Sequence, residues 1–307
     1  YKRVFDDQGN RLPTPPEMET ATLFDVASNT KMFATNFALQ KLVTEGHIDI
    51  RDRVSKYIPE YTGDGRDAVT IKDLLTHTAG YAPQIRFFDP DNKYGKHLYS
   101  QSKSHTEQLI LNSVPLEVSR DLSPMYSDTG FMLLGMLIER VTGQALDEYV
   151  ETQIYAPLGL RNSKFTPLEK GHVASEIAAT EVNGNSRGGR VDFPNMRTGV
   201  IQGEVHDEKA FHSMQGVAGH AGLFSNAHDL SVLAQVVLNR GGYGEVQLFS
   251  ASVFDQFSKA SDADITLGAG WRRAGNGDRK WHFGPYASAQ AIGHTGWTGT
   301  VTVIDPE

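Results

Sequence analysis

The stretch SNTKMFATNFALQKLVTEG, residues 28–46, contains the pattern that decides the fold. Its apolar residues recur at the spacing of one helical face, and they are Met32, Phe33, Phe37, Leu39, Leu42 and Val43. Gly46 stands where a helix C-terminal cap belongs. The pattern predicts a helix from Ser28 to about Glu45. Ser28 and Lys31 are three residues apart, a spacing that brings two side chains together only on a helix.

A hydroxyl and an amine at the start of a helix suit a nucleophile and its base. The helix N-terminus adds unpaired backbone N–H groups and a positive dipole end, both of which stabilise an anion. Lys31 would accept the proton of Ser28 if burial lowered the lysine pKa. The alternative is that Ser28 is an N-terminal cap and Lys31 a solvated lysine. A second Ser-x-x-Lys, Ser100 to Lys103, opens no strongly periodic helix, and we expect no catalytic role for it.

The composition excludes several classes of protein. The chain of 307 residues is 39% hydrophobic and 21% charged, and its net charge of −8 argues against a nucleic-acid partner. The cysteine count is zero, which excludes disulfides, thiolate zinc sites, iron–sulfur clusters and cysteine nucleophiles. Apolar stretches such as residues 131–138 are far shorter than the roughly 18 residues of a membrane span.

The tripeptide Tyr126-Ser127-Asp128 stands before a second periodic helix, expected from about Asp128 to Val141. A tyrosine near a lysine in a cleft can act as a general base or pass on a proton. Taken alone, the tripeptide is more typical of a half-buried structural tyrosine beside an Asp N-cap.

The stretch His294-Thr295-Gly296-Trp297 comes directly before the alternating segment 300–304, which predicts a strand. A Thr-Gly pair at a strand edge would offer a hydroxyl and backbone N–H groups to a substrate, and glycine would allow close approach. The alternative for His294 is a surface histidine at the end of a strand.

The order of elements predicts an α/β (α+β) fold in which a helical lobe is inserted into a sheet lobe. We expect a single domain over residues 1–307, with the sheet lobe at about 1–45 and 215–307 and the helical lobe at about 46–214. The late strands are expected near 266–273, 280–283, 291–295 and 299–305. Residues 1–5 and 300–305 both look like strands in progress, so we expect a chain cut from a longer one at both ends.

The order of the three motifs, Ser-x-x-Lys, Tyr-x-Asp and His-Thr-Gly, resembles the serine β-lactamase and penicillin-binding protein superfamily. The framework resembles it too, in residues 42–50, 69–80, 126–143, 155–160 and 219–225. The resemblance is to the class C β-lactamase-like branch and spans nearly the whole chain. Residues 205–211, with the long Gly- and Asn-rich loop before them, look most similar to the penicillin-binding protein 4B type. The implied fold is an antiparallel sheet flanked by helices, with an inserted, mostly helical lobe.

The resemblance implies roles for the residues that match its motifs. Ser28 would be the acylated nucleophile, and Lys31 and Tyr126 would manage its proton. Backbone N–H groups of Ser28 and Trp297 would form an oxyanion hole. The residues that bind the oxyanion or line the substrate would be Trp297, His294, Thr295, Gly296 and Asp128.

The implied reaction is acyl transfer to serine followed by hydrolysis. The substrate would be a small peptide ending in D-alanyl-D-alanine, an ester or a β-lactam, and no cofactor or metal is implied. The family also implies a monomer in the periplasm or cell envelope, which would meet a membrane only through an N-terminal anchor outside this sequence.

Two departures from the family pattern modify this expectation. Asp128 stands where the family often has Asn, and an ionised carboxylate accepts hydrogen bonds but cannot donate one to a substrate carbonyl. His294 replaces a permanently cationic lysine, so a substrate carboxylate loses a dependable counter-charge near neutral pH. We therefore expect a weak D-alanyl-D-alanine carboxypeptidase. The alternatives are an esterase of the same fold and a penicillin or peptidoglycan sensor that does not turn over.

Histidines of the late loops raise one further hypothesis, a metal site formed by His206, Asp207, His212 and His220. Their spacings match no known ligand pattern, and the chain has no His-Glu-x-x-His. We expect structural contacts or cleft-wall positions instead, with His206 and Asp207 the best candidates for the cleft wall.

Overall fold

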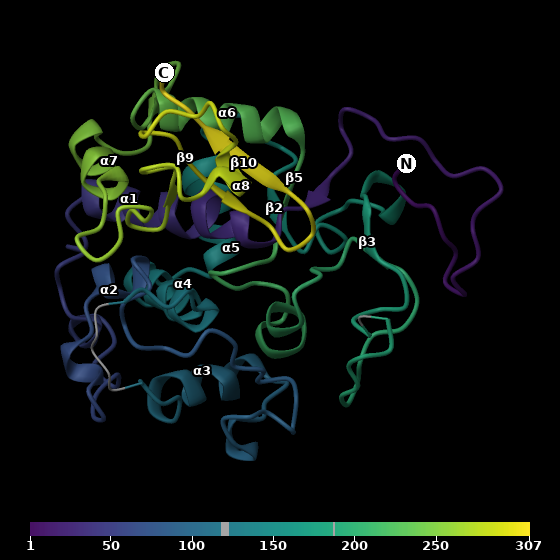
Figure 1. The fold of residues 1–307 in the computed structure, drawn as a ribbon, viewed down its shortest axis with the longest axis horizontal. Coiled ribbons are helices and arrows are strands. Elements are labelled where there is room, and N and C mark those ends of the chain that lie inside the picture. The colour runs from purple at the N-terminus through teal and green to yellow at the C-terminus, as the bar shows by residue number, and fades with distance from the viewer. Residues whose placement is uncertain (118–122, 187) are drawn as a thin grey trace.

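The computed structural model describes residues 1–117, 123–186 and 188–307. In Figure 1 the strands β5, β9 and β10 lie in the upper half with helices α6 and α7, and helices α2, α3 and α4 lie below them. The α-helices are α1 (Phe37–Thr44), α2 (Ile71–Leu75), α3 (Lys103–Asn112), α4 (Asp128–Thr142), α5 (Leu146–Val150), α6 (Ala227–Leu238), α7 (Ala251–Ser258) and α8 (Lys280–Phe283). The strands are β1 (Phe24–Asp25), β2 (Lys164–Phe165), β3 (Ala179–Glu181), β4 (Ile201–Gln202), β5 (Leu223–Ser225), β6 (Gly242–Tyr243), β7 (Val246–Gln247), β8 (Arg272–Arg273), β9 (Ile292–Thr295) and β10 (Val301–Ile304).

The strands form short antiparallel sheets, which together with the helices confirm the predicted fold class. One sheet has the order β1-β5-β2 and another the order β10-β9-β8. In the second sheet Thr295 pairs with Val301, and Gly293 pairs with Arg272 on the other side. This register places Arg272 beside the strand that carries the His-Thr-Gly motif. Strand β2 comes from within the predicted helical lobe and pairs with β5, so the segment 46–214 also contributes to a sheet.

Three strand predictions were wrong. Residues 280–283 form the single-turn helix α8, because a four-residue apolar pattern does not distinguish a strand from one helical turn. The strand expected near 266–273 is reduced to β8. At the N-terminus, the expected strand is reduced to one bridge between Phe5 and Arg11.

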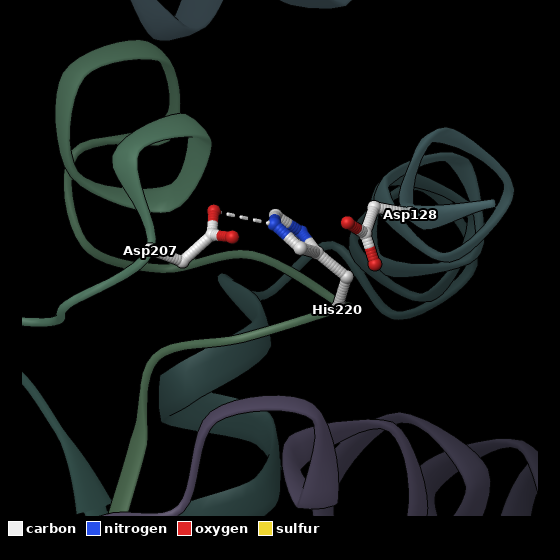
Figure 2. Close-up of side chains that lie close together, drawn as sticks. All are labelled: Asp128, Asp207 and His220. Atoms are coloured by element: carbon white, nitrogen blue, oxygen red, sulfur yellow. Dashed lines mark hydrogen bonds and ion pairs between the residues drawn. The ribbon is translucent and has the colours of Figure 1, made fainter. Parts of the chain in front are cut away.

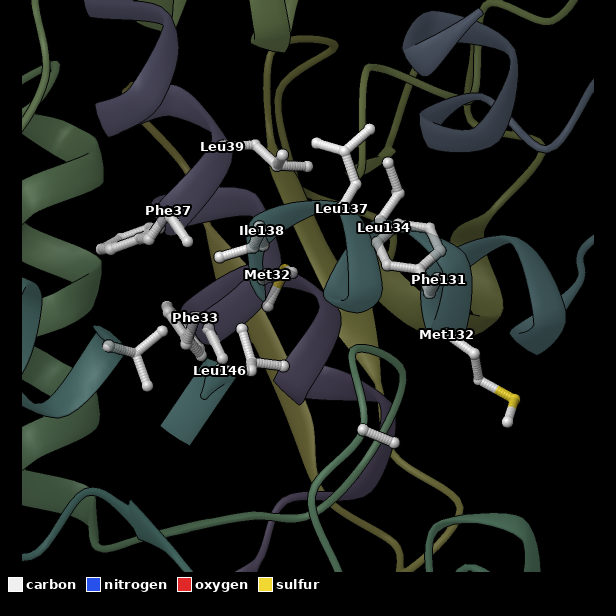
Figure 3. Close-up of a cluster of buried hydrophobic side chains, with 14 of the residues drawn as sticks. Met32, Phe33, Phe37, Leu39, Phe131, Met132, Leu134, Leu137, Ile138 and Leu146 are labelled. Atoms are coloured by element: carbon white, nitrogen blue, oxygen red, sulfur yellow. The ribbon is translucent and has the colours of Figure 1, made fainter. Parts of the chain in front are cut away.

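The predicted first helix is present but is built from three kinds of turn. A 3-10 turn, η1 (Ala27–Asn29), leads into a π-helical segment, η2 (Lys31–Asn36), and then into α1. Wider π-helical turns are found frequently at functional sites. Figure 3 shows the apolar side chains of this composite helix against those of α4, and both sets are fully buried. The core therefore fixes the helix that carries Ser28 and Lys31 against the helix that Tyr126 precedes.

A close backbone approach positions the segment 218–221 against α4. A Cβ on Gly219 would stand 2.1 Å from the carbonyl oxygen of Phe131, and a Cβ on Gly135 would stand 3.0 Å from Gly219 N. Only glycine allows this contact. It brings the carbonyl of His220 within 3.1 Å of Lys31 Nζ. Among the described residues, no helix is long and apolar enough to cross a membrane.

Candidate active site

The hydroxyl of Ser28 lies where two segments distant in sequence meet. Its Oγ accepts a hydrogen bond from Lys31 Nζ at 3.0 Å and another from Tyr126 Oη at 3.0 Å. The turn before it is unusual, because Ala27 has a φ of +46°, a region that a residue with a Cβ rarely adopts. Asp25 Oδ1 accepts from Ala27 N at 2.8 Å and helps to hold this turn. Backbone strain of this kind is common at functional sites.

Lys31 is fully buried, and its ammonium has three further partners. Nζ donates to Asp128 Oδ1 at 2.9 Å and to the His220 carbonyl, and it lies 4.9 Å from the centre of the Tyr126 ring. Burial alone would lower the pKa of Lys31, but the Asp128 carboxylate and the Tyr126 phenol outweigh it, so the pKa is raised. The condition set for Lys31 as a base, a pKa lowered by burial, is therefore not met, because the ion pair with Asp128 outweighs burial.

Asp128 belongs to a buried set of alternating charges. Its Oδ2 lies 3.1 Å from Lys209 Nζ, and Lys209 lies 3.4 Å from Asp207 Oδ2. Asp207 Oδ1 accepts from His220 Nε2 at 2.8 Å, a contact drawn in Figure 2. Lys31 and Lys209 hold the pKa of Asp128 below its usual range, and Lys209 and His220 do the same for Asp207, although burial acts the other way. Two carboxylates and two ammonium groups thus compensate one another within a few ångströms.

The same set is the one place among the described residues where acidic and histidine side chains have metal-like spacing. One ligand atom from each of Asp128, Asp207 and His220 lies within 4.8 Å of the others (Figure 2). The ammonium of Lys209 touches both carboxylates and supplies the positive charge that a metal would bring. Of the four residues in the loop-histidine hypothesis, the structure brings together Asp207 and His220. The arrangement of Asp128, Asp207 and His220 therefore fits the ammonium of a buried lysine better than a metal ion.

Two buried histidines lie against the ring of Tyr126. The His77 and His294 rings are 4.6 and 5.8 Å from it, centre to centre. Burial lowers the pKa of His77 to about 3, and burial together with the Arg272 charge lowers that of His294 well below its usual value. His77 Nδ1 accepts from Ser127 N at 3.3 Å, so its proton is on Nε2. Both rings are neutral near pH 7.

The expectation that His294 faces the substrate needs correction. The residues of β9 and its continuation that line the cleft are Thr295, Gly296 and Trp297, whereas His294 is 3% exposed and packs behind Tyr126. The reason is the alternation of a strand, in which neighbouring side chains point to opposite faces. Trp297 is 72% exposed, at the mouth of the cleft.

A cleft of about 520 Å³ opens at Ser28. Its lining includes the predicted residues Ser28, Tyr126, Asp128, Asp207, Thr295, Gly296 and Trp297, and also Gln84, Arg86, Phe88, Glu208, Lys209 and Arg272. The latter six were given no role from the sequence. Glu208 and Lys209 lie in the segment 205–211 quoted for the family resemblance, Lys209 at the start of the π-helical segment η8 (Lys209–Ser213), and the others come from loops and β8.

Arg272 is the most informative of the residues missed. Its guanidinium carbon lies 5.0 Å from the centre of the Tyr126 ring and 5.9 Å from that of Trp281. Its Nε is buried and has no hydrogen-bond partner among the residues that the structure describes. The cleft lining thus includes a guanidinium that has no ion pair among the described residues. The cationic lysine that His294 replaces in the family motif thus has a counterpart in Arg272 on the neighbouring strand β8.

Other sequence candidates lie outside the cleft. His206 Nε2 is 2.5 Å from Glu181 Oε2, and its backbone N donates to Asp25 Oδ2, so it holds the loop to the turn before Ser28. His206 is not part of the cleft lining, whereas Asp207 is. In the second Ser-x-x-Lys, Ser100 Oγ accepts from Thr106 at 2.9 Å and Lys103 pairs with Glu139 at 3.0 Å. Those two side chains therefore have separate structural partners.

The fold and this geometry agree with comparisons to known proteins. A family model described as Beta-lactamase matches residues 2–307. The chain is 49% identical over 301 residues to the N-acetylmuramyl-L-alanine amidase of Bacillus subtilis (strain 168), covering 96% of this chain and 68% of the relative. It is 52% identical over 301 residues to an Escherichia coli (strain K12) protein named "Putative D-alanyl-D-alanine carboxypeptidase", covering 96% of this chain and 69% of the relative.

Solved structures agree at the level of the fold. A penicillin-binding protein homologue from Caulobacter crescentus superposes with a TM-score of 0.61 at 23% identity, covering 97% of this chain and 77% of the other. The finer resemblance to the class C branch and the 4B type stays a prediction. The family model and the curated relatives establish the broader assignment: the chain belongs to the β-lactamase family and is a serine hydrolase of the penicillin-binding type.

Proposed function

We propose that the protein hydrolyses an amide bond in cell-wall peptides through transient acylation of Ser28, within the cell envelope. The observation that carries this proposal is the pair of hydrogen bonds at one hydroxyl oxygen, from Lys31 Nζ and from Tyr126 Oη, each 3.0 Å long. An alcohol is a weak nucleophile at its ordinary pKa and needs a group that accepts its proton during attack. The amine and the phenol are the two groups placed to do so.

The reaction follows from these contacts. Ser28 Oγ attacks the substrate carbonyl carbon while its proton passes to the Lys31 and Tyr126 pair, and the same proton is returned to the leaving nitrogen. Backbone N–H groups of Ser28 and Trp297, both residues of the cleft lining, are assigned to the carbonyl oxygen as it becomes negative. Water then attacks the acyl ester by the same proton route. Because Asp128 raises the pKa of Lys31, the basic form of the lysine is scarce at neutral pH, and acylation is slow.

The D-alanyl-D-alanine bond is the first candidate for the scissile bond. A carboxypeptidase must recognise the free C-terminal carboxylate of its substrate, and the Arg272 guanidinium, which has no ion pair among the described residues, lines the same cleft as Ser28. Arg–carboxylate contacts are among the stronger hydrogen bonds in proteins. The printed name of the Escherichia coli relative agrees with this choice. The product would be D-alanine, released slowly.

One observation favours a second candidate, the amide between N-acetylmuramic acid and L-alanine. Each carboxylate oxygen of Asp128 is paired with a lysine, so the group is ionised. An ionised carboxylate cannot donate a hydrogen bond to the peptide carbonyl beside a D-alanyl-D-alanine bond. The Bacillus subtilis relative is named for cleavage of the muramyl bond. The carboxylates that follow L-alanine in a cell-wall peptide would then meet Arg272.

Two substrates separate these candidates. Of the two candidate bonds, muramyl dipeptide (N-acetylmuramyl-L-alanyl-D-isoglutamine) contains only the muramyl amide. A pentapeptide ending in D-alanyl-D-alanine contains only the D-alanyl-D-alanine bond. Release of D-alanine supports the carboxypeptidase, and release of N-acetylmuramic acid supports the amidase. Both activities are expected to disappear in Ser28→Ala and to persist in Ser100→Ala, the matched serine of the second motif. Activity that survives in Ser28→Ala would overturn the proposal.

The same protein is also incubated with a chromogenic ester and with labelled penicillin. Rapid release from the ester alone would assign an esterase. A stable adduct at Ser28 in mass spectra, without turnover of any substrate, would assign a sensor.

A further inference from the structure

Lys209 is a buried lysine that lines the cleft, and the proposed reaction has not used it. Its side chain is 6% exposed. Nζ lies 3.1 Å from Asp128 Oδ2, 3.4 Å from Asp207 Oδ2 and 3.4 Å from Gln84 Oε1. Donor–acceptor distances for good N–H···O bonds are centred near 2.9–3.0 Å, so two of the three contacts are long. The ammonium therefore retains donor capacity toward a better-placed acceptor.

The charges around Lys209 decide what kind of acceptor it suits. Asp128 and Asp207 balance the positive charges of Lys209 and Lys31, whereas Arg272 has no ion pair among the described residues. A substrate anion is therefore attracted to Arg272 and gains little at Lys209. An uncharged carbonyl oxygen fits Lys209, because it accepts a hydrogen bond without disturbing the balance.

The neighbouring Gln84 shows how such an acceptor would enter. Its amide oxygen already contacts Lys209 Nζ from the cleft side, and both residues line the cleft. A substrate amide has the same acceptor as this side chain. Replacing one neutral amide oxygen by another keeps every charge in place.

We propose that Lys209 is a substrate-binding residue whose ammonium donates a hydrogen bond to an uncharged amide carbonyl in the acyl part of the substrate, in place of Gln84. This inference rests on the proposed function, since Arg272 then holds the carboxylate of the leaving group and the acyl part extends toward η8. Lys209 supplies the N–H donor that Asp128 cannot. Substrates with an amide carbonyl at this point are selected over those without one.

Two ligands whose acyl chains have equal length test the proposal. Acetyl-D-alanyl-D-alanine carries an acetamido group in its acyl part, and 2-methylpentanoyl-D-alanine has an n-propyl group in its place. Their dissociation constants are measured by NMR titration in the Ser28→Ala background, where nothing is turned over. Adding Lys209→Met is expected to weaken binding of the acetamido ligand about 10- to 100-fold, which is the range for a hydrogen bond to a charged group. Binding of the propyl ligand is expected to weaken less than about threefold.

Two further variants keep the test decisive. Lys209→Met leaves Asp207 without its ammonium, so Lys209→Met with Asp207→Asn restores the charge balance and is expected to discriminate in the same way. Lys170→Met is the matched control, because Lys170 also bridges two carboxylates, at 2.7 and 2.8 Å, outside the cleft lining. Equal weakening of both ligands would assign Lys209 a structural role and overturn the inference. If Lys209→Met selectively weakens the acetamido ligand but the protein that keeps Ser28 is never acylated, the proposed function alone is rejected.

Discussion

Replacing Asp128 by asparagine is expected to increase the rate at which a β-lactam acylates Ser28. The carboxylate lies 2.9 Å from Lys31 Nζ in a fully buried setting and is the main reason that the lysine pKa is raised. An opposite charge within about 4–6 Å shifts a pKa by about 1–3 units, and each unit changes the amount of neutral amine tenfold. Removing the charge therefore increases the basic form of Lys31 about 10- to 1000-fold at pH 7, and the acylation rate should follow.

The assay measures the second-order rate constant for labelling by a fluorescent penicillin at pH 7. Asp207→Asn is the matched control, because Asp207 contacts Lys209 and His220 but has no contact with Lys31. Breaking a buried ion pair destabilises a protein by about 3–5 kcal/mol, so thermal unfolding of each variant is followed in parallel. If Asp128→Asn is folded and is acylated no faster than the original protein, the role assigned to the carboxylate is wrong.

Three further predictions concern pH and substrate charge. Because the pKa of Lys31 is raised, kcat/KM for a chromogenic ester should increase from about pH 6 to 9 without a plateau, and a plateau below about pH 8 would contradict this. Arg272→Gln should raise KM for acetyl-D-alanyl-D-alanine about tenfold and leave KM for its C-terminal amide unchanged, whereas equal increases would exclude a carboxylate contact. Burial lowers the pKa of His77 to about 3, so below about pH 6.5 the unfolded chain binds more protons than the folded protein. The free energy of unfolding should therefore decrease by on the order of 5 kcal/mol as pH falls from about 6.5 to 3. Urea unfolding should show a flatter pH dependence for His77→Asn, which keeps an acceptor for Ser127 N; an unchanged dependence would assign the slope to other groups.

The sequence was most informative where function and local structure share one short pattern. Ser28 and Lys31 are three residues apart in an apolar helix, so their contact follows from helix geometry even though the helix contains a π-helical segment. The start of α4 at Asp128 was likewise local and was predicted correctly. Convergence of Tyr126 with Ser28 is not local, and its prediction came from the order of motifs.

The residues that were missed share a different property, which is that their surroundings come from distant parts of the chain. Arg272 faces Tyr126 because β8 pairs with β9. Lys209 at the start of η8 contacts Asp128 at the start of α4. No periodicity or spacing reports such contacts. The balance of burial and charge at Lys31 likewise depends on a residue 97 positions away. His294 was placed on the wrong face because a motif does not say which side of its strand faces the cleft.

The buried charges explain why one residue can stabilise this site and slow it at once. An ammonium buried without a partner costs several kcal/mol and tends to lose its proton instead. Lys31 avoids this because Asp128 lies beside it, and Asp128 is in turn shared with Lys209. The ion pair keeps Lys31 in place but also keeps it protonated, which is the form that cannot accept the Ser28 proton. An asparagine at position 128 would leave the opposite balance, with a larger neutral, proton-accepting fraction of Lys31 and a weaker contact. In the proposed mechanism, the choice at this single position sets how fast Ser28 reacts, while Arg272 and Lys209 set what it reacts with.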